Sequence, residues 1–281
     1  MNTAPSEPPP APTSAAADAF RLAIGTFTRL PTRAPSLVDR RRGGLSLLLA
    51  PAVGLLLGGL AACAGLLLWW FAGIAGNATT PIACVAAGVT LTAAGWLSRG
   101  LHLDGLADLA DGLGSVLGPA TDGGQRMTTA MRDPQIGAFG AIALIFTIGI
   151  QLAALASCFA TGLGATAFVA AAISSRSTLA LVARRGTPRR SSGLGASVVG
   201  VVPPTVGLVV WSVTTAFVTV LLWFFGAAWF AGPIAASMAL TAALVVRRIA
   251  LRRLTAVTGD VLGACVEVAA TVFLVLLAVL A

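Results

Sequence analysis

Three aspartates with helical spacing are the residues best suited to carry out chemistry. Asp104, Asp108 and Asp111 are separated by four and three residues, so on a helix their carboxylates lie on one face and can converge on one cation. Carboxylates this close repel one another unless a cation neutralises them, and Mg²⁺ is a hard ion that prefers oxygen ligands. The spacing therefore predicts a Mg²⁺ site. The alternative is the solvated acidic face of an amphipathic helix.

Polar residues on either side of the aspartates could take part. His102 lies nearly opposite Asp104 on an ideal helix, which suits a helix start, a phosphate contact or a base. Further on, Arg132 suits phosphate binding and Asp133 suits a metal ion or an arginine, while Gly137 permits close approach of a ligand to the backbone. The alternative for this second stretch is a juxtamembrane arginine anchor with a capping aspartate.

Two acids near the carboxyl end are candidates for the same site. Asp260 and Glu267 share a helix face, and Glu267 is expected inside the last apolar segment, where an ionisable group is costly and indicates function. We expect this segment to pack beside the 101–112 helix. Asp260 would then reach the metal site, and Glu267 would line its floor or pair with Arg176, which could equally face a phosphate.

The elements that must position these residues are membrane-spanning helices. Hydrophobic residues make up 57% of the chain and charged residues 10%, whereas soluble domains carry about 25% charged residues. The composition predicts an all-α, polytopic helical bundle. Runs of roughly 20 apolar residues cross a bilayer, and seven such runs lie near residues 44–72, 81–97, 136–157, 165–183, 199–225, 229–246 and 261–280.

The ends of the chain and its cysteines allow a simple domain prediction. Residues 1–18 are rich in Pro, Ala, Ser and Thr and predict a disordered tail, and residues 19–281 predict a single membrane domain. The four cysteines lie in apolar stretches without the paired spacing of a zinc or disulfide framework. We therefore expect them to be small buried apolar residues.

Arginine placement predicts the orientation. The chain contains no lysine, and its arginines fall on one side of the predicted spans. The positive-inside rule places the amino terminus, the basic loops and the aspartate helix in the cytoplasm, and the carboxyl terminus outside. The net charge of +8 follows from this topology, so we expect no nucleic-acid partner.

Together these stretches resemble the cobalamin synthase family, the adenosylcobinamide-GDP ribazoletransferases. The likeness covers nearly the whole chain beyond the first twenty residues. It is carried by Phe-Thr-Arg-Leu-Pro at 27–31, Gly-Leu-His-Leu-Asp-Gly-Leu-Ala-Asp at 100–108 with Asp111 and Gly112, Met-Arg-Asp at 131–133 with Gly137 and Gly140, Ser175 and Arg176, and Thr-Gly-Asp-Val-Leu-Gly-Ala at 258–264 with Glu267.

The resemblance implies a Mg²⁺-dependent transfer in a bacterial cytoplasmic membrane. Adenosylcobinamide-GDP would react with α-ribazole or its 5′-phosphate to give adenosylcobalamin, or its phosphate, and GMP. Self-association, or association with other cobalamin-assembly enzymes, is left open. The implied metal ligands are Asp104, Asp108 and Asp111, with Asp133, Asp260 and Glu267 as further or outer ligands. The implied substrate contacts are Arg29, Arg132, Arg176 and Gly137, and the implied catalytic residues are His102, Asp104, Asp108 and Arg132, with His102 or an aspartate as the base.

Two other functions compete with this one. The spaced aspartates loosely resemble those of CDP-alcohol phosphotransferases, which make lipids. Intramembrane acids also bind the moving ions of secondary transporters and channels. A transporter should hold its acids near the bilayer midplane in interrupted spans, whereas here most acids lie in a polar interval between spans.

Overall fold

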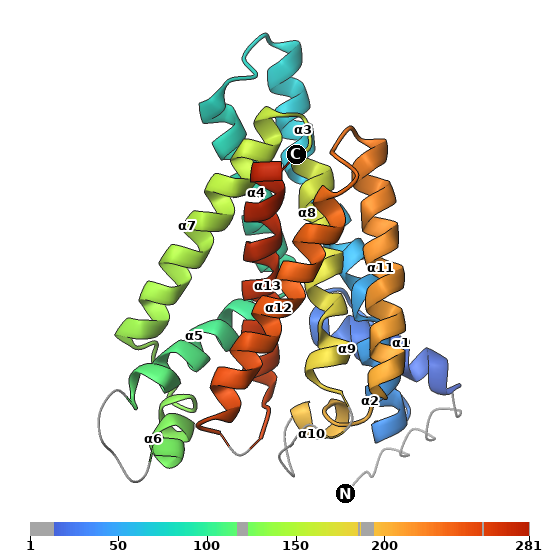
Figure 1. Cartoon of the computed structure of the whole chain (residues 1–281), viewed down its shortest axis with the longest axis vertical. Coiled ribbons are helices and arrows are strands. Elements are labelled where there is room, and N and C mark those ends of the chain that lie inside the picture. The colour runs from blue at the N-terminus through green and yellow to red at the C-terminus, as the bar shows by residue number, and fades with distance from the viewer. Residues whose placement is uncertain (1–13, 117–122, 185, 187–193, 255, 281) are drawn as a thin grey trace, which may run out of the picture.

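Seven long apolar helices form the body of the molecule (Figure 1). The structure is a computed structural model that describes residues 14–116, 123–184, 186, 194–254 and 256–280. The predicted all-α membrane bundle is confirmed, because each of the seven helices is long and apolar enough to cross a bilayer. They are α3 (Ala50–Ile74), α4 (Thr80–Leu97), α7 (Ala138–Ala160), α8 (Gly164–Ser177) continued by α9 (Leu179–Val182), α11 (Pro204–Phe224), α12 (Ala231–Leu251) and α13 (Gly259–Leu280).

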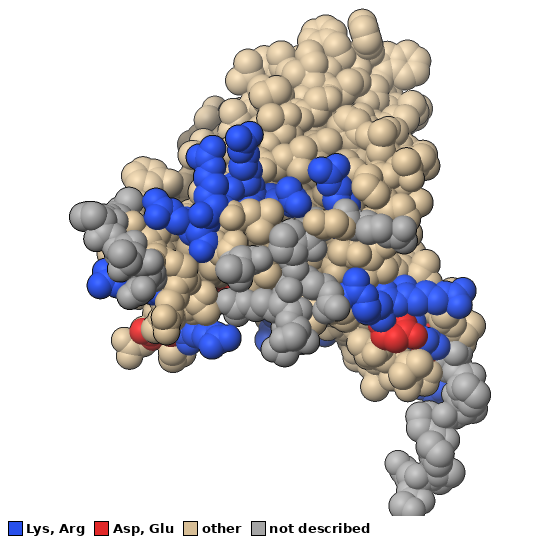
Figure 2. Space-filling model, turned by 60° about the horizontal axis from the view of Figure 1, so that its bottom comes forward, with Lys and Arg blue, Asp and Glu red and all other residues tan. Residues whose placement is uncertain are grey.

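In the described part of the chain, five shorter helices gather at one end of the bundle, which we call the polar end (Figure 1). Seen from this end, arginine side chains spread across the surface, whereas the visible sides of the bundle above it are uncharged (Figure 2). α13 finishes at the opposite end, as an odd number of spans requires. The five helices are α1 (Ala15–Phe27), α2 (Arg40–Leu48), α5 (Leu101–Gly114), α6 (Gly123–Ala130) and α10 (Leu194–Val198).

Prolines lie in the first turn of three spans, α3, α4 and α11. The first predicted run, 44–72, is divided between α2 and α3, with Leu49 between them and Pro51 in the first turn of α3. The fifth begins at Pro204 rather than at residue 199. Proline is common in the first helical turn because a backbone N–H at that position would have no partner within the helix.

Aromatic side chains mark the far end of the bundle. Trp70, Phe71, Phe224 and Trp229 are all exposed and lie where α3 and α11 end and where α12 begins. Tryptophan and other aromatic residues are enriched where a membrane meets water. This belt and the arginines of the polar end therefore bound the bundle on its two sides.

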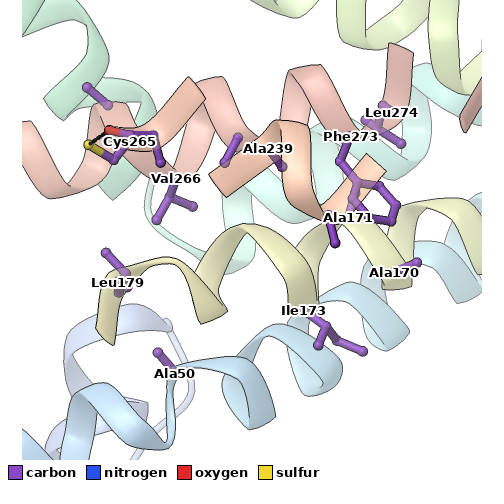
Figure 3. Close-up of a cluster of buried hydrophobic side chains, with 14 of the residues drawn as sticks. Ala50, Ala170, Ala171, Ile173, Leu179, Ala239, Cys265, Val266, Phe273 and Leu274 are labelled. Atoms are coloured by element: carbon purple, nitrogen blue, oxygen red, sulfur yellow. Dashed lines mark hydrogen bonds between the residues drawn. The ribbon is translucent and has the colours of Figure 1, made fainter. Parts of the chain in front are cut away.

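α8 and α13 are the central helices. Within their most apolar windows 78% and 56% of residues are buried, against 17–39% in the other spans. Alanines of α8 face Phe273 and Leu274 of α13, and the Cys265 thiol donates to the Ala243 carbonyl of α12 at 3.3 Å (Figure 3). Polar residues on α8 and α13 are thus enclosed by protein instead of facing lipid.

Small residues allow α3 to approach α8 closely. Gly54 and Gly58 are four residues apart on α3, and a Cβ on Gly58 would lie 2.8 Å from the Cβ of Ala172. Small residues at this spacing let membrane helices pack backbone to backbone. This glycine pair was not predicted from the sequence, although its spacing is visible there.

The first helix begins within the stretch predicted as a tail. Ser14 caps α1, which begins at Ala15, so residues 15–18 are helical. The physical reason is Asp18, which is fully buried. Its carboxylate accepts hydrogen bonds from Ser36 N–H at 2.9 Å, from Ser36 Oγ at 2.6 Å and from Arg42 Nε at 3.0 Å. Asp18 therefore ties α1 to α2. Residues 1–13 lie outside the described part of the chain.

Candidate active site

A left-handed turn sets α5 across the polar end. Arg99 and Gly100 have φ angles of 57° and 66°, a region that is costly for a residue with a Cβ. Arg99 is held there by hydrogen bonds from its guanidinium group to the carbonyl oxygens of Gly25 at 2.6 Å and Thr26 at 3.3 Å. After this turn, α5 packs against α13 and α7.

Asp111 holds the start of α7. Its carboxylate accepts hydrogen bonds from the N–H groups of Gly137 at 2.7 Å and Gly140 at 2.8 Å. A Cβ on either glycine would collide with that carboxylate, so a larger residue at either position would displace it from these hydrogen bonds. The carboxylate also lies at a helix amino terminus, where negative charge is favoured. Gly137, predicted to contact substrate, uses its N–H for Asp111.

α5 and α13 cross in direct contact beside the aspartates. A Cβ on Gly105 would lie 2.7 Å from the carbonyl oxygen of Asp260, and a Cβ on Gly263 would lie 3.2 Å from the Cα of His102. The prediction that the seventh span packs beside the 101–112 helix is therefore confirmed. The crossing brings Asp260, far along the chain, to the aspartates of α5.

The acids of α5 and α13 act on one another electrostatically. The pKa of Asp108 is raised from 3.8 to about 6, first by burial and then by the charges of Asp104, Asp260 and Asp111. Asp104 is exposed and Asp108 is half-buried. Asp260 Oδ2 accepts a hydrogen bond from Thr258 Oγ1 at 3.2 Å. Four acids from two helices thus share one electrostatic environment, with Asp108 at its centre.

The fit of these acids to a metal ion is partial. In the described ranges, no three His, Cys, Asp or Glu side chains are arranged so as to hold a metal ion as they stand. The donor set nevertheless consists of carboxylate oxygens, which suit Mg²⁺. Burial, and then repulsion by the neighbouring acids, raises the pKa of Asp108, and a bound divalent cation would relieve that repulsion. Charge and donor type fit the ion.

His102 is buried behind the acids. It is 4% exposed, and its ring lies against Phe27 with centroids 6.0 Å apart. Burial, and then the charge of Arg176, hold the pKa of His102 well below its usual value, so its imidazole is neutral. His102 Nδ1 lies 3.5 Å from Arg176 Nη2, and its Nε2 is buried without a hydrogen-bond partner.

Arg176 is the buried cation of α8. Its Nη1 donates to the Ala172 carbonyl at 3.2 Å, and its Nε is buried without a partner. The charge of Glu267 on α13 acts on it, but no ion pair within 4 Å joins the two side chains. An arginine with an unused donor favours an anionic or carbonyl ligand.

Glu267 is held by a polar group within the bundle. Gln151 of α7 donates from Nε2 to Glu267 Oε2 at 3.1 Å and to Thr271 Oγ1 at 2.9 Å. Because buried charges are costly unless hydrogen-bonded, Gln151 stabilises the glutamate. Sequence reasoning missed Gln151; a polar residue within an apolar span was the available signal.

Two cavities lie on either side of the start of α5. The first, which we call the small cavity, has a volume of about 310 Å³ and is lined by residues that include His102, Asp104 and Asp260. The second, the large cavity, has a volume of about 730 Å³, and its lining includes Arg29, Arg99, Arg176, Gln151 and Glu267. His102 lines one cavity and Arg176 the other, so their contact lies in the wall between them.

Three predicted residues stand apart from the acids. Arg29 lines the large cavity, where its guanidinium group stacks 4.7 Å from the ring of Trp96. Arg132 and Asp133 are exposed on the connection between α6 and α7, and Asp133 Oδ1 accepts from Gln135 N–H at 3.0 Å. Neither residue lines the two cavities. Their proposed roles remain predictions.

Fold and site together define a multi-pass helical membrane protein with an acidic centre at one end. Its acids come from the start of the last span and from a short helix between the second and third. A buried histidine and arginine separate the two cavities beside them.

Comparison with known proteins gives the family. The sequence model of the family described as cobalamin-5-phosphate synthase matches residues 19–278 of this chain. An adenosylcobinamide-GDP ribazoletransferase of Frankia casuarinae is 36% identical over 268 residues, which cover 92% of this chain and 93% of that protein. One from a Nocardioides species is 35% identical over 90% of this chain and 94% of its own length, and one from Shigella boydii is 30% identical over 92% and 98%. No solved structure matches.

The chain belongs to the cobalamin-5-phosphate synthase family. It is a transferase of cobalamin biosynthesis, built as a bundle of seven apolar spans.

Proposed function

We propose that this chain joins adenosylcobinamide-GDP to α-ribazole or to its 5′-phosphate, releasing GMP and forming adenosylcobalamin or its phosphate. The observation that supports this most is the convergence of acids from α5 and α13 beside two cavities. Phosphoryl transfer requires mainly positioning and charge neutralisation, and this arrangement can supply both.

The reaction is a substitution at phosphorus. A ribose hydroxyl oxygen of ribazole forms a bond to the phosphorus nearer the cobinamide. The bond from that phosphorus to the oxygen bridging the two phosphates breaks, and GMP leaves with the electron pair. The hydroxyl proton passes to a carboxylate; Asp104 is the exposed acid that lines the small cavity and can receive it.

The acids of the crossing would hold Mg²⁺. Asp104, Asp108 and Asp260 are the residues that we place on the ion, because their charges meet at Asp108. When bound, Mg²⁺ would neutralise charge that develops on the phosphoryl oxygens. Asp111 would act mainly by holding the start of α7 in place, since both of its carboxylate oxygens already accept hydrogen bonds from that helix start. Asp133 and Glu267 would contribute as outer groups.

Arginines would hold the phosphates and the rest of adenosylcobinamide-GDP, which is the donor substrate of the transfer. Arg176 has an unused buried donor, and Arg29 lines the same large cavity. Arg132 lies on the exposed connection between α6 and α7 and would reach adenosylcobinamide-GDP from outside the cavities. Arginine suits this task because its planar group binds phosphate through two donors.

The polar end would face the cytoplasm of a bacterial inner membrane. Arginines gather there (Figure 2), and positively charged residues favour the cytoplasmic side. The acidic centre lies at the same end and would receive its charged donor substrate from the cytoplasm.

Reconstitution tests the proposal. The purified full chain in phospholipid vesicles would be given adenosylcobinamide-GDP, α-ribazole and Mg²⁺, and products would be followed by mass spectrometry. We expect adenosylcobalamin and GMP in equal amounts, and no product when the divalent ions are chelated. Formation of neither product, with α-ribazole or with its phosphate, would overturn the proposal.

A further inference from the structure

We propose that the small cavity binds the nucleoside substrate, with its apolar wall around the base and His102 donating a hydrogen bond to the sugar. This inference rests on the proposed function, because it assigns a place to one of the two substrates of that reaction. It is carried by the lining of the cavity and by the unpartnered nitrogen of His102.

The wall of the cavity is mostly apolar. Leucines, valines and a phenylalanine surround it: Leu22 and Phe27 of α1, Leu47 of α2, Leu101 of α5, Leu179 of α9, Val198 of α10, Val257, and Leu262 of α13. Pockets of this kind surround a small molecule with apolar side chains and orient it with a few polar groups. The volume of about 310 Å³ is at the low end for such pockets, which excludes the corrinoid ring system of the other substrate.

The polar groups of the cavity lie together. His102, Asp104 and Asp260 all line it, and the last two belong to the acidic centre. A ligand with an apolar flat base and a sugar would therefore meet the wall with its base and the acids with its hydroxyl groups. Ribazole has this form, since it joins a methylated benzimidazole to ribose.

His102 is set to donate rather than to accept. Because arginine side chains only donate hydrogen bonds, we assign Nδ1 of His102, 3.5 Å from Arg176 Nη2, as the acceptor nitrogen. The ring hydrogen then lies on Nε2, which is buried without a partner in the structure. Leaving a buried donor without a partner is destabilising. An oxygen of the bound sugar would satisfy it.

Guanosine of the other substrate is the competing occupant. Guanine carries several hydrogen-bonding groups on its ring edge, and burying them against leucines without partners is costly. Two of the lining hydroxyl groups are already used, since Ser46 donates to the Gly43 carbonyl at 2.8 Å and Thr258 donates to Asp260. The cavity therefore favours the apolar base.

A cavity-filling variant tests the assignment. Leu22→Trp places a bulky indole ring at a half-buried position of the wall. The control, Phe20→Trp, introduces the same ring on the same helix at an exposed position outside the cavity. Binding of radiolabelled α-ribazole to the full chain in lipid nanodiscs would be measured without the second substrate. We expect the Kd to rise at least about tenfold in Leu22→Trp and to stay at the wild-type value in Phe20→Trp.

A pair of substitutions tests the hydrogen bond separately. His102→Gln keeps an N–H donor near the position of Nε2, whereas His102→Leu removes it. The Leu variant should weaken ribazole binding by about tenfold, and the Gln variant should recover most of that loss. Thermal unfolding of each variant would check that the bundle remains folded.

The outcomes separate the two proposals. If the wild-type chain forms product but Leu22→Trp and His102→Leu both bind ribazole as the wild type does, the cavity assignment is wrong and the proposed function stands. If these variants bind GMP more weakly than the wild type but bind ribazole equally well, the cavity belongs to guanosine and the inference is also overturned. If the wild type neither binds ribazole nor forms product, both proposals fail.

Discussion

Gly105 of α5 lies directly against the backbone of Asp260 at the start of α13, so that a Cβ on this glycine would meet the Asp260 Cα at 2.9 Å. This contact fixes where the last span crosses the aspartate helix. Because Asp104 and Asp108 lie on that helix, the relative position of the acids depends on this one close approach.

Gly105→Val should therefore separate α13 from α5 and lower turnover by at least about tenfold, since overpacking displaces the backbone at a typical cost of about 1–3 kcal/mol. Initial rates in vesicles measure the effect. Gly59→Val is the matched control, because nothing lies within 4 Å of a Cβ at Gly59. Equal activity of the two variants would show that the crossing does not position the acids.

Asp108 should make the stability of the ion-free protein depend on pH. Its pKa is about 6 in the folded chain and 3.8 ordinarily, so between these values the folded state binds more protons than the unfolded state. Stability contributed by protonation is present below this range and is lost as the pH rises through it. In Asp108→Asn this loss should disappear, and thermal unfolding at about pH 4 and about pH 7, with divalent ions chelated, measures the difference. An identical pH response in wild type and variant would contradict the assignment.

Asp111 should contribute to stability through α7. Asp111→Ala leaves the N–H groups of Gly137 and Gly140 without their acceptor, at a typical cost of about 0.5–2 kcal/mol for a lost cap. Denaturant or thermal unfolding checks this value. Asp111→Asn, which keeps one acceptor oxygen, should lose less. If both variants unfold like the wild type, the carboxylate does not hold the helix start.

Arg176 and Glu267 should be energetically coupled. Both side chains line the large cavity, and their charges act on one another without a direct ion pair. Removing one of two such buried charges leaves the other uncompensated and is commonly worse than removing both. We expect Arg176→Leu to destabilise the bundle more than the Arg176→Leu/Glu267→Gln double variant does. A double-mutant cycle in thermal unfolding gives the coupling, about 0.5–3 kcal/mol for groups in one network. Additive effects would show that the two charges act separately.

The sequence predicted the spans and the importance of α5 because both leave local signals. Apolar runs define spans by length alone, and three aspartates spaced for one helix face define a polar helix. The same reasoning, extended by topology, placed Asp260 next to α5. Burial of Glu267 in a span likewise pointed to a partner such as Arg176.

Other features depended on packing that no local pattern contains. Asp18 looked like part of a polar tail, and only its contacts with Ser36 and Arg42 place it in the core. Asp111 shares a helix face with the other aspartates, yet its oxygens meet α7 instead. The two cavities also arise from elements distant in sequence, so their division by His102 and Arg176 emerges only in three dimensions.

The central claim is that acids from α5 and α13 hold one divalent ion, and a Mn²⁺ titration followed by electron paramagnetic resonance tests it most directly. Mn²⁺ replaces Mg²⁺ as an oxygen-preferring ion and reports binding without turnover. Asp39→Asn serves as the control, since Asp39 caps α2 away from the acids and asparagine can also cap a helix. We expect Asp108→Asn and Asp260→Asn each to weaken Mn²⁺ binding at least about tenfold, and Asp39→Asn to bind as the wild type does. Wild-type affinity in Asp260→Asn would contradict the claim.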